Sequence, residues 1–350
     1  MADAPAAPPA AVRARGRSVP LDALRTTLGR PPVWLVIWSI QLLLALAPAL
    51  VHQHWFQDAT AHRYPRGRLF ANLDAEFRFD QRQESALVDA ATGQIGAVIV
   101  LLAMLAGGFF AGGWLQVFLE RTGGHSLRRF FLGGSRYFWR FVRLLVLSVL
   151  SLALASWVVY GLPWNQLVLG WLHGVPAGDW DKLETLGSEA TVLFLRGTQH
   201  VLFALAFGLV MVWGDYTRTR IALHDTSSAL WAGLCTWFTL LRHPVRTLGP
   251  GLSLFALEAA LVLGAGWFSR AVEGDLFAHP DMLNVAILLA VGQLVLLWQV
   301  VLRGARYHAA VQVSREVVRP IARPDPWKSS VGGPGGPRYP LGGDEYGESL

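Results

Sequence analysis

Six stretches of the chain are almost wholly apolar, and polar connections separate them. They cover about residues 33–51, 96–119, 144–160, 190–212, 251–268 and 284–301. A helix of about 20 apolar residues is long enough to cross the hydrocarbon core of a bilayer. The pattern predicts an all-α, polytopic membrane protein whose six-helix transmembrane domain occupies residues 31–318.

The two ends of the chain have other patterns. Residues 1–30 open on a basic tail rich in Pro and Ala, and residues 319–350 are rich in Pro and Gly. Neither tail has enough apolar residues to build a core, so both are predicted to be disordered. In residues 18–29, leucines recur at helical spacing before a glycine, which predicts a short interfacial helix.

Two connections, at residues 121–143 and 213–250, combine arginine with aromatic residues. Their apolar positions recur at helical spacing between charged ends, which predicts amphipathic helices at the membrane surface. In the second connection, Asp215 is interpreted as a helix-end acid and Asp225 as a helix cap. The arginines of both segments either anchor the topology or bind anionic lipid headgroups. The headgroup candidates are Arg128, Arg129, Arg136, Arg140, Arg143, Arg218, Arg220, Arg242 and Arg246.

The distribution of positive charge predicts which side of the membrane each connection faces. The N-terminal tail, the two arginine-rich connections and the C-terminal segment hold five, six, four and seven Lys or Arg residues. The other three connections hold five, one and one. Because Lys and Arg are retained on the cytoplasmic side, both termini and both arginine-rich connections are predicted to be cytoplasmic.

Composition agrees with a bilayer environment. Hydrophobic residues make up 53% of the 350 positions and charged residues 15%, against about 25% charged residues in soluble domains. The net charge of +6 predicts no nucleic-acid partner, because the arginines flank apolar spans. The single cysteine, Cys235, excludes a disulfide within the chain. No cofactor is predicted, and no metal site, because His52 and His54 lack a recognised ligand spacing.

Four polar residues inside the predicted spans are candidate site residues: Glu258, Gln293, Arg196 and His200. A charge near the bilayer centre costs about 2.5–3.5 kcal/mol, so Glu258 is predicted to face the other helices and to be paired or protonated. Arg196 either reaches towards Glu258 or extends to the outer interface. A polar clamp between helices is the favoured interpretation, and a proton-coupled or substrate-binding site is the alternative.

The second span contains Gly108 and Gly112, four residues apart. Rows of small residues at this spacing let another helix approach closely. The row is a candidate surface for a protein partner or for a homo-oligomer, and membrane lipids are the other predicted partners.

The sequence GDYTRTRIALHDTSSALWAGLCTWFTLLRHPVRTLG of residues 214–249 and the sequence FLGGSRYFWRFVRLL of residues 131–145 carry a family resemblance. Together they resemble a loose group of uncharacterised bacterial inner-membrane proteins. They are also similar to the six-helix membrane domain attached to some glycerophosphodiester phosphodiesterases. The resemblance covers most of spans two to six and implies a bacterial inner-membrane protein. It implies no activity, because the chain has no room for the soluble phosphodiesterase domain.

The sequence contains no motif of soluble-type catalysis. The P-loop, H-E-x-x-H and G-x-S-x-G patterns are all absent, and no catalytic residue is predicted. The favoured hypothesis is a non-enzymatic component that organises or assists a membrane partner or lipid. One alternative is a small transporter that uses Glu258, and another is a membrane enzyme that acts on lipid-linked substrates through Asp179 and Asp181.

Overall fold

The computed structural model describes residues 18–60, 82–120, 125–175, 188–278 and 282–317. These residues are almost wholly helical and contain no β-strand. Six of their helices are long and apolar enough to cross a membrane. The prediction of an all-α protein with six candidate transmembrane helices is confirmed, and the two tails predicted to be disordered lie outside the described residues.

Each predicted span lies within one long helix. The long helices are α2 (Pro31–Thr60), α5 (Arg82–Leu119), α6 (Ser126–Tyr160), α8 (Glu189–His224), α10 (Pro244–Ala278) and α11 (Met282–Val317). The shorter elements are α1 (Val19–Leu28), α7 (Leu162–Trp164), the π-helix η1 (Asn165–Leu172) and α9 (Ala229–Arg242). The long helices extend past the predicted spans because the backbone keeps its helical hydrogen bonds where the side chains become polar.

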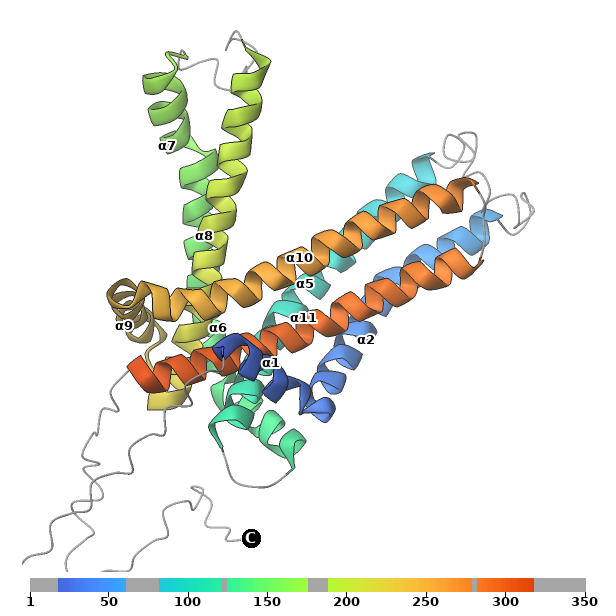
Figure 1. The fold of residues 1–350 in the computed structure, drawn as a ribbon. Coiled ribbons are helices and arrows are strands. Elements are labelled where there is room, and N and C mark those ends of the chain that lie inside the picture. The colour runs from blue at the N-terminus through green and yellow to red at the C-terminus, as the bar shows by residue number, and fades with distance from the viewer. Residues whose placement is uncertain (1–17, 61–81, 121–124, 176–187, 279–281, 318–350) are drawn as a thin grey trace, which may run out of the picture. The chain divides into compact units, whose positions relative to one another are not determined.

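The largest fully buried side chains gather at one end of the long helices. They include Trp114 of α5, Phe130 and Phe141 of α6, Ile221 of α8 and Val311 of α11. This end comprises the last turns of α5, α8 and α11 and the first turns of α6 (Figure 1). We call it the helix junction, and it holds the main hydrophobic core.

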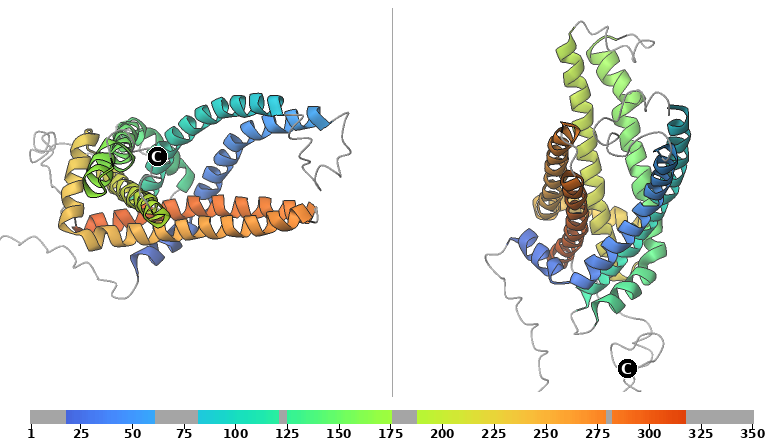
Figure 2. Two further views of the ribbon diagram at one scale, coloured as in Figure 1. Left: turned by 90° about the horizontal axis from the view of Figure 1, so that it is seen from above. Right: turned by 90° about the vertical axis from the view of Figure 1, so that its right-hand side faces the viewer.

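Away from the helix junction, large apolar side chains face outward. Phe194 of α8 is 73% exposed and Trp267 of α10 is 76% exposed. Withdrawing such a side chain from water is worth about 1.5–3 kcal/mol, so these surfaces suit a lipid environment. Here α6 runs beside α8, and α10 runs beside α11 (Figures 1 and 2). The outer parts of the long helices therefore present their apolar side chains to lipid.

Glycines allow α5 and α6 to cross in backbone contact within the helix junction. A Cβ atom on Gly133 of α6 would lie 2.6 Å from the carbonyl oxygen of Gly112 of α5 and 2.2 Å from Gln116 Cβ. Gly108, one turn before Gly112, faces Phe141 of α6. Both glycines of the row that was a candidate partner surface are buried. The row is used inside the chain and offers no free surface to a second protein.

Helix α1 coincides with the predicted interfacial helix. Its buried residues are Ala23 and Thr27, and α1 packs mainly on α11. Gly304 of α11 makes room for this contact, because a Cβ there would lie 2.7 Å from Thr27 Cγ2. Leu21 and Leu28 are exposed, at 68% and 39%, whereas Leu24 is partly buried against the core cluster that α1 shares with α11. Only part of the predicted leucine face is therefore free to contact the membrane interface.

The connection after the third span is more ordered than the sequence predicted. Residues 162–172 form α7 and η1, although they were assigned to a polar connection. Trp164 and Leu169 pack with Leu195 of α8 in a small separate core, and this apolar contact explains the additional helix. Asp179 and Asp181, the acids of the lipid-linked-substrate hypothesis, lie outside the described residues.

Candidate functional site

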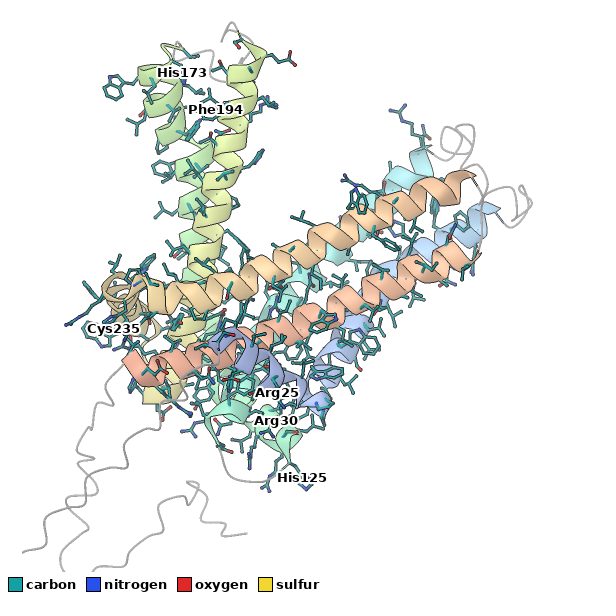
Figure 3. The ribbon with its side chains drawn as sticks, viewed as in Figure 1. Arg25, Arg30, His125, His173, Phe194 and Cys235 are labelled. Atoms are coloured by element: carbon teal, nitrogen blue, oxygen red, sulfur yellow. The ribbon has the colours of Figure 1, made fainter. Side chains whose placement is uncertain are left out.

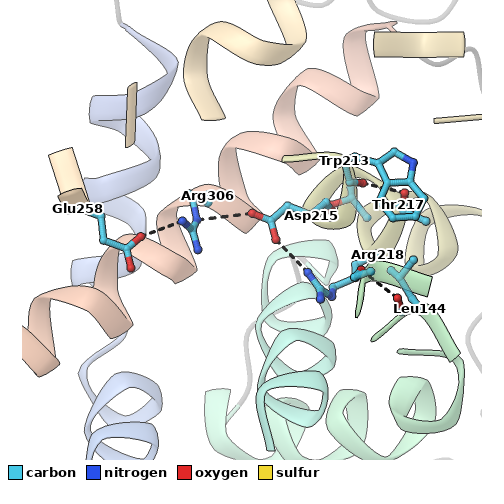
Figure 4. A network of polar contacts seen from close by, with 9 residues as sticks. Leu144, Trp213, Asp215, Thr217, Arg218, Glu258 and Arg306 are labelled. Atoms are coloured by element: carbon cyan, nitrogen blue, oxygen red, sulfur yellow. Dashed lines mark hydrogen bonds and ion pairs between the residues drawn. The ribbon is translucent and has the colours of Figure 1, made fainter. Parts of the chain in front are cut away.

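Four charged side chains, two of them buried and two partly buried, connect α8, α10 and α11 (Figure 4). Arg306 Nη1 of α11 donates a hydrogen bond to Glu258 Oε2 of α10 at 2.8 Å. Arg306 Nε lies 3.5 Å from Asp215 Oδ2 of α8, and Arg218 Nη1 donates to Asp215 Oδ1 at 3.1 Å. The side chains of Arg306 and Asp215 are only 4% and 7% exposed. We call these four residues the ion-pair network, and its two positive and two negative charges balance.

Local structure explains how the ion-pair network is held. Asp215 and Arg218 are three residues apart on α8, so their side chains lie on the same helix face. The ring of Phe255, one turn before the acid on α10, has its centroid 5.9 Å from the Arg306 guanidinium carbon. Tyr216 Oη donates to the carbonyl oxygen of Thr247 at 2.8 Å, which joins α8 to the first turns of α10.

A cavity of about 10 Å³ adjoins the network and is lined by Asp215, Tyr216 and Arg306. Such a volume holds about one water molecule. Arg306 Nε is within ion-pair distance of Asp215 but makes no hydrogen bond to any described residue. The cavity can therefore hold a water that completes the contacts of Arg306, but it is too small for an organic substrate.

The four polar residues predicted from the spans do not form one site. Glu258 has a partner, as predicted, but that partner is Arg306, which the sequence analysis did not single out. Arg196 is exposed on α8, and none of its contacts reaches Glu258. His200 Nδ1 lies 3.0 Å from the hydroxyl of Tyr160. Gln293 Oε1 is buried without a hydrogen-bond partner among the described residues.

Asp215 was assigned the wrong environment by the sequence analysis. It was interpreted as a helix-end acid, but it lies within α8, nine residues before the last helical residue, His224. Its neighbours on α8, Trp213 and Thr217, are buried, so the carboxylate faces the protein interior. The sequence could have indicated the interior position of Asp215, because the helical pattern continues through residues 213–222 and Arg218 lies one turn after Asp215.

The nine arginines proposed for lipid headgroups divide into two groups. Five of them are engaged inside the protein: Arg129 with Glu120, Arg136 and Arg140 with Asp225, Arg218 with Asp215, and Arg220 with Thr239 and the carbonyl of Cys235. The other four are exposed and make no hydrogen bond or ion pair to a described residue: Arg128, Arg143, Arg242 and Arg246. Only this second group keeps a free guanidinium for a headgroup.

Helix α9 has large apolar side chains on its outer face and small residues on its inner face. Trp231 is 61% exposed, Phe238 72% and Leu241 71%. The buried residues of α9 include Ala232 and Gly233, and the latter accepts a hydrogen bond from the Trp213 indole at 2.9 Å. The helix lies crosswise to α10, at the end where α10 begins (Figures 1 and 2). This arrangement is typical of a helix lying in the membrane interface.

The residues labelled in Figure 3 lie at two separate ends of the helices. Cys235 of α9 lies at the helix junction, and Arg25 and Arg30 lie nearby around α1. His173 and Phe194 lie at the distant end of α6, η1 and α8. Helices α9 and α1, which carry the exposed Arg242 and Arg25, thus belong to the same end of the molecule.

Asp225 connects the turn after α8 to α6. It is the C-cap of α8 in the left-handed backbone conformation, with φ of 47°, which agrees with its prediction as a cap. Its carboxylate bonds Arg140 and lies 3.4 Å from Arg136 Nη2. Partial burial acts to raise the pKa of Asp225, but the hydrogen bonds and charges of these two arginines outweigh it and hold the pKa below its usual range.

We expect Asp225→Asn to destabilise the protein at neutral pH and to have no effect in strong acid. Asn tolerates the left-handed conformation, so the change removes mainly the ion pairs, which are worth about 0.2–1 kcal/mol at this exposure. Because the folded-state pKa is depressed, this stabilisation is complete above the unfolded pKa of about 3.9 and is lost as the pH falls through the lower folded pKa. Thermal unfolding in detergent at pH 7 and pH 3 checks this: the difference between Asp225→Asn and the wild type should be smaller at pH 3, and an equal difference at both pH values would contradict the prediction.

The ion-pair network joins α8, α10 and α11 through Arg306. In the described part of the chain, no three His, Cys, Asp or Glu side chains lie close enough together to hold a metal ion. Comparisons with protein-family models, with curated proteins and with solved structures found no match to this chain.

Proposed function

We propose that the protein is a non-enzymatic, multi-pass component of a bacterial inner membrane that organises anionic lipids at the cytoplasmic leaflet. The observation that carries this proposal is the outer face of α9. Its large apolar side chains suit the upper acyl region. Arg242 at the end of α9 and Arg246 in the first turn of α10 are exposed and make no hydrogen bond or ion pair to a described residue. Apolar insertion next to free guanidinium groups is the combination that binds anionic membranes.

The first half of α6 repeats the same combination. Trp139 is 71% exposed and Phe131 47% exposed, and both lie on the side of α6 that carries the exposed Arg128 and Arg143. Aromatic side chains favour the headgroup level of a bilayer, and each basic residue near an anionic surface adds about 1 kcal/mol. Helices α6 and α9 therefore both favour an anionic membrane surface.

The charge distribution supports a cytoplasmic position for this end of the molecule and for both termini. The resemblance to bacterial inner-membrane proteins supports the compartment. The transporter hypothesis has less support, because the Glu258 carboxylate is bound to Arg306 and the neighbouring cavity of about 10 Å³ fits about one water.

The test uses full-length protein in nanodiscs that contain phosphatidylcholine with spin-labelled phosphatidylglycerol. We expect the wild-type protein to immobilise the anionic lipid in preference to labelled phosphatidylcholine. Arg242→Gln combined with Arg246→Gln should lower this preference by a factor of about 5 for each arginine, the equivalent of about 1 kcal/mol.

Arg196→Gln is the matched control, because Arg196 is exposed but lies towards the opposite end of α8. It should leave the preference for anionic lipid unchanged. If the Arg242/Arg246 double variant kept the wild-type preference, the proposal that α9 organises anionic lipid would be wrong.

A further inference from the structure

A second cavity lies where α2, α5 and α11 meet, and its volume is about 30 Å³. Three of its lining side chains are polar: Gln41 of α2 and Gln299 and Arg303 of α11. The rings of Phe110 and Trp114 of α5 form part of its apolar wall. None of these residues belongs to the ion-pair network or to α9. The cavity combines one guanidinium, two carboxamides and aromatic walls.

Arg303 is a free charge in this cavity. It is partly buried and makes no hydrogen bond or ion pair to a described residue, whereas Arg306, one turn further along α11, has two carboxylate partners. Glu258 and Asp215 are thus already paired with Arg306. A partly desolvated guanidinium without a carboxylate favours an anion, and its fork of donors matches a phosphate.

The neighbouring face of α2 carries further polar atoms without partners. The indole Nε1 atoms of Trp34 and Trp38 and the Oε1 atom of Gln41 are buried and have no hydrogen-bond partner among the described residues. Positions 34, 38 and 41 lie on one face of a helix. Leaving a buried donor or acceptor unpaired is unfavourable. Of these three residues, Gln41 lines the cavity, so a group bound in the cavity can donate to its Oε1 atom.

The depth of these groups fits an amphipathic ligand. Arg303 follows the predicted end of the sixth span at residue 301, so its guanidinium is near headgroup level. Trp38 and Gln41 are deeper in the first span, and Leu43 beyond them is 66% exposed and faces lipid. A phospholipid has its phosphate at headgroup level, the level of Arg303, and its acyl chains below, at the level of Leu43.

We propose that this cavity, which we call the Arg303 pocket, binds the phosphate group of an anionic phospholipid of the cytoplasmic leaflet. Arg303 pairs with the phosphate, and Gln41 accepts from a ligand hydroxyl or a bound water. This site is separate from the α9 surface and holds one lipid in a defined pose, whereas α9 gathers lipids by charge and apolar insertion.

The experiment measures lipid retention and thermal stability of the full-length protein in a neutral detergent. Native mass spectrometry should show one tightly held phosphatidylglycerol per chain after delipidation and titration, and the lipid should raise the unfolding temperature. Arg303→Gln should weaken this binding at least tenfold, and Gln41→Leu should weaken it several-fold. Unchanged retention in Arg303→Gln would overturn the proposal.

Two further arms identify the source of the phosphate and separate this site from α9. Stabilisation by phosphatidylglycerol but not by inorganic phosphate supports a lipid, and stabilisation by inorganic phosphate as well supports recognition of the phosphate group alone. If neither stabilises the protein, the pocket binds no phosphate and the inference fails. Arg143→Gln, at an exposed position of α6, and the Arg242/Arg246 double variant should both keep the tightly held lipid. Binding in the Arg303 pocket can therefore be observed even if the proposal for α9 fails.

Discussion

Arg306→Met is expected to lower the stability of the folded protein by about 3–5 kcal/mol, the usual cost of removing one partner from a buried ion pair. Arg306 is the only described residue that contacts both Glu258 and Asp215. Without it, Glu258 loses its positive partner while 15% exposed, and Asp215 keeps only Arg218. The measurement is the unfolding temperature in detergent, followed by circular dichroism at neutral pH.

A second variant shows whether Arg306→Met destabilises the protein through the uncompensated charge or through a packing defect. Adding Glu258→Gln to Arg306→Met removes the stranded carboxylate, so the double variant should recover part of the lost stability. Arg196→Met, an exposed arginine on α8, is the control and should unfold close to the wild-type temperature. A wild-type unfolding temperature for Arg306→Met would show that the ion-pair network does not clamp the helices.

Gly133→Ala is expected to cost about 3 kcal/mol, the upper part of the range for overpacking. The added Cβ would lie 2.2 Å from Gln116 Cβ and 2.6 Å from the carbonyl oxygen of Gly112. A backbone carbonyl cannot rotate away as the end of a flexible side chain can, so α5 and α6 must separate. Because these two helices form the most extensive helix pair in the chain, their separation weakens the whole helix junction.

Gly107→Ala is the matched control for this change. Gly107 is also helical and lies one residue before Gly108 on α5, but a Cβ there would have no atom within 4 Å. Alanine is the better helix former by about 1 kcal/mol, so the control should be neutral or slightly stabilising. Equal destabilisation by both changes would mean that helix packing in this region does not depend on the glycine crossing.

The six helices could be predicted from the sequence because the membrane imposes a simple pattern. A run of about 20 apolar residues between arginines has few other uses. The ends of the helices were harder to predict, because the composition of a helix changes where it leaves the hydrocarbon region although the helix itself continues. Asp215 was therefore interpreted as a helix-end acid, although it lies inside α8.

The pairing within the site could not be predicted for a related reason. Glu258 was recognisable because one acid interrupts an apolar run, but its partner depends on how α10 and α11 are placed against each other. Likewise, the spacing of Gly108 and Gly112 predicted a close helix contact without identifying α6 as the partner. Sequence spacing gives the face of a helix, whereas the neighbour of that face depends on the packing of the whole chain.

The position of the last helix has a consequence for biosynthesis. The chain is made from its N-terminus, and α11 supplies Val300, Val301 and Val311 to the core as well as Arg306 to Asp215 and Glu258. The first five long helices are consequently made before the arginine that joins α8 to α10. Until synthesis has passed residue 306, the acid of α10 lacks its positive partner, so the link between α8 and α10 through Arg306 is the last part of the ion-pair network to form.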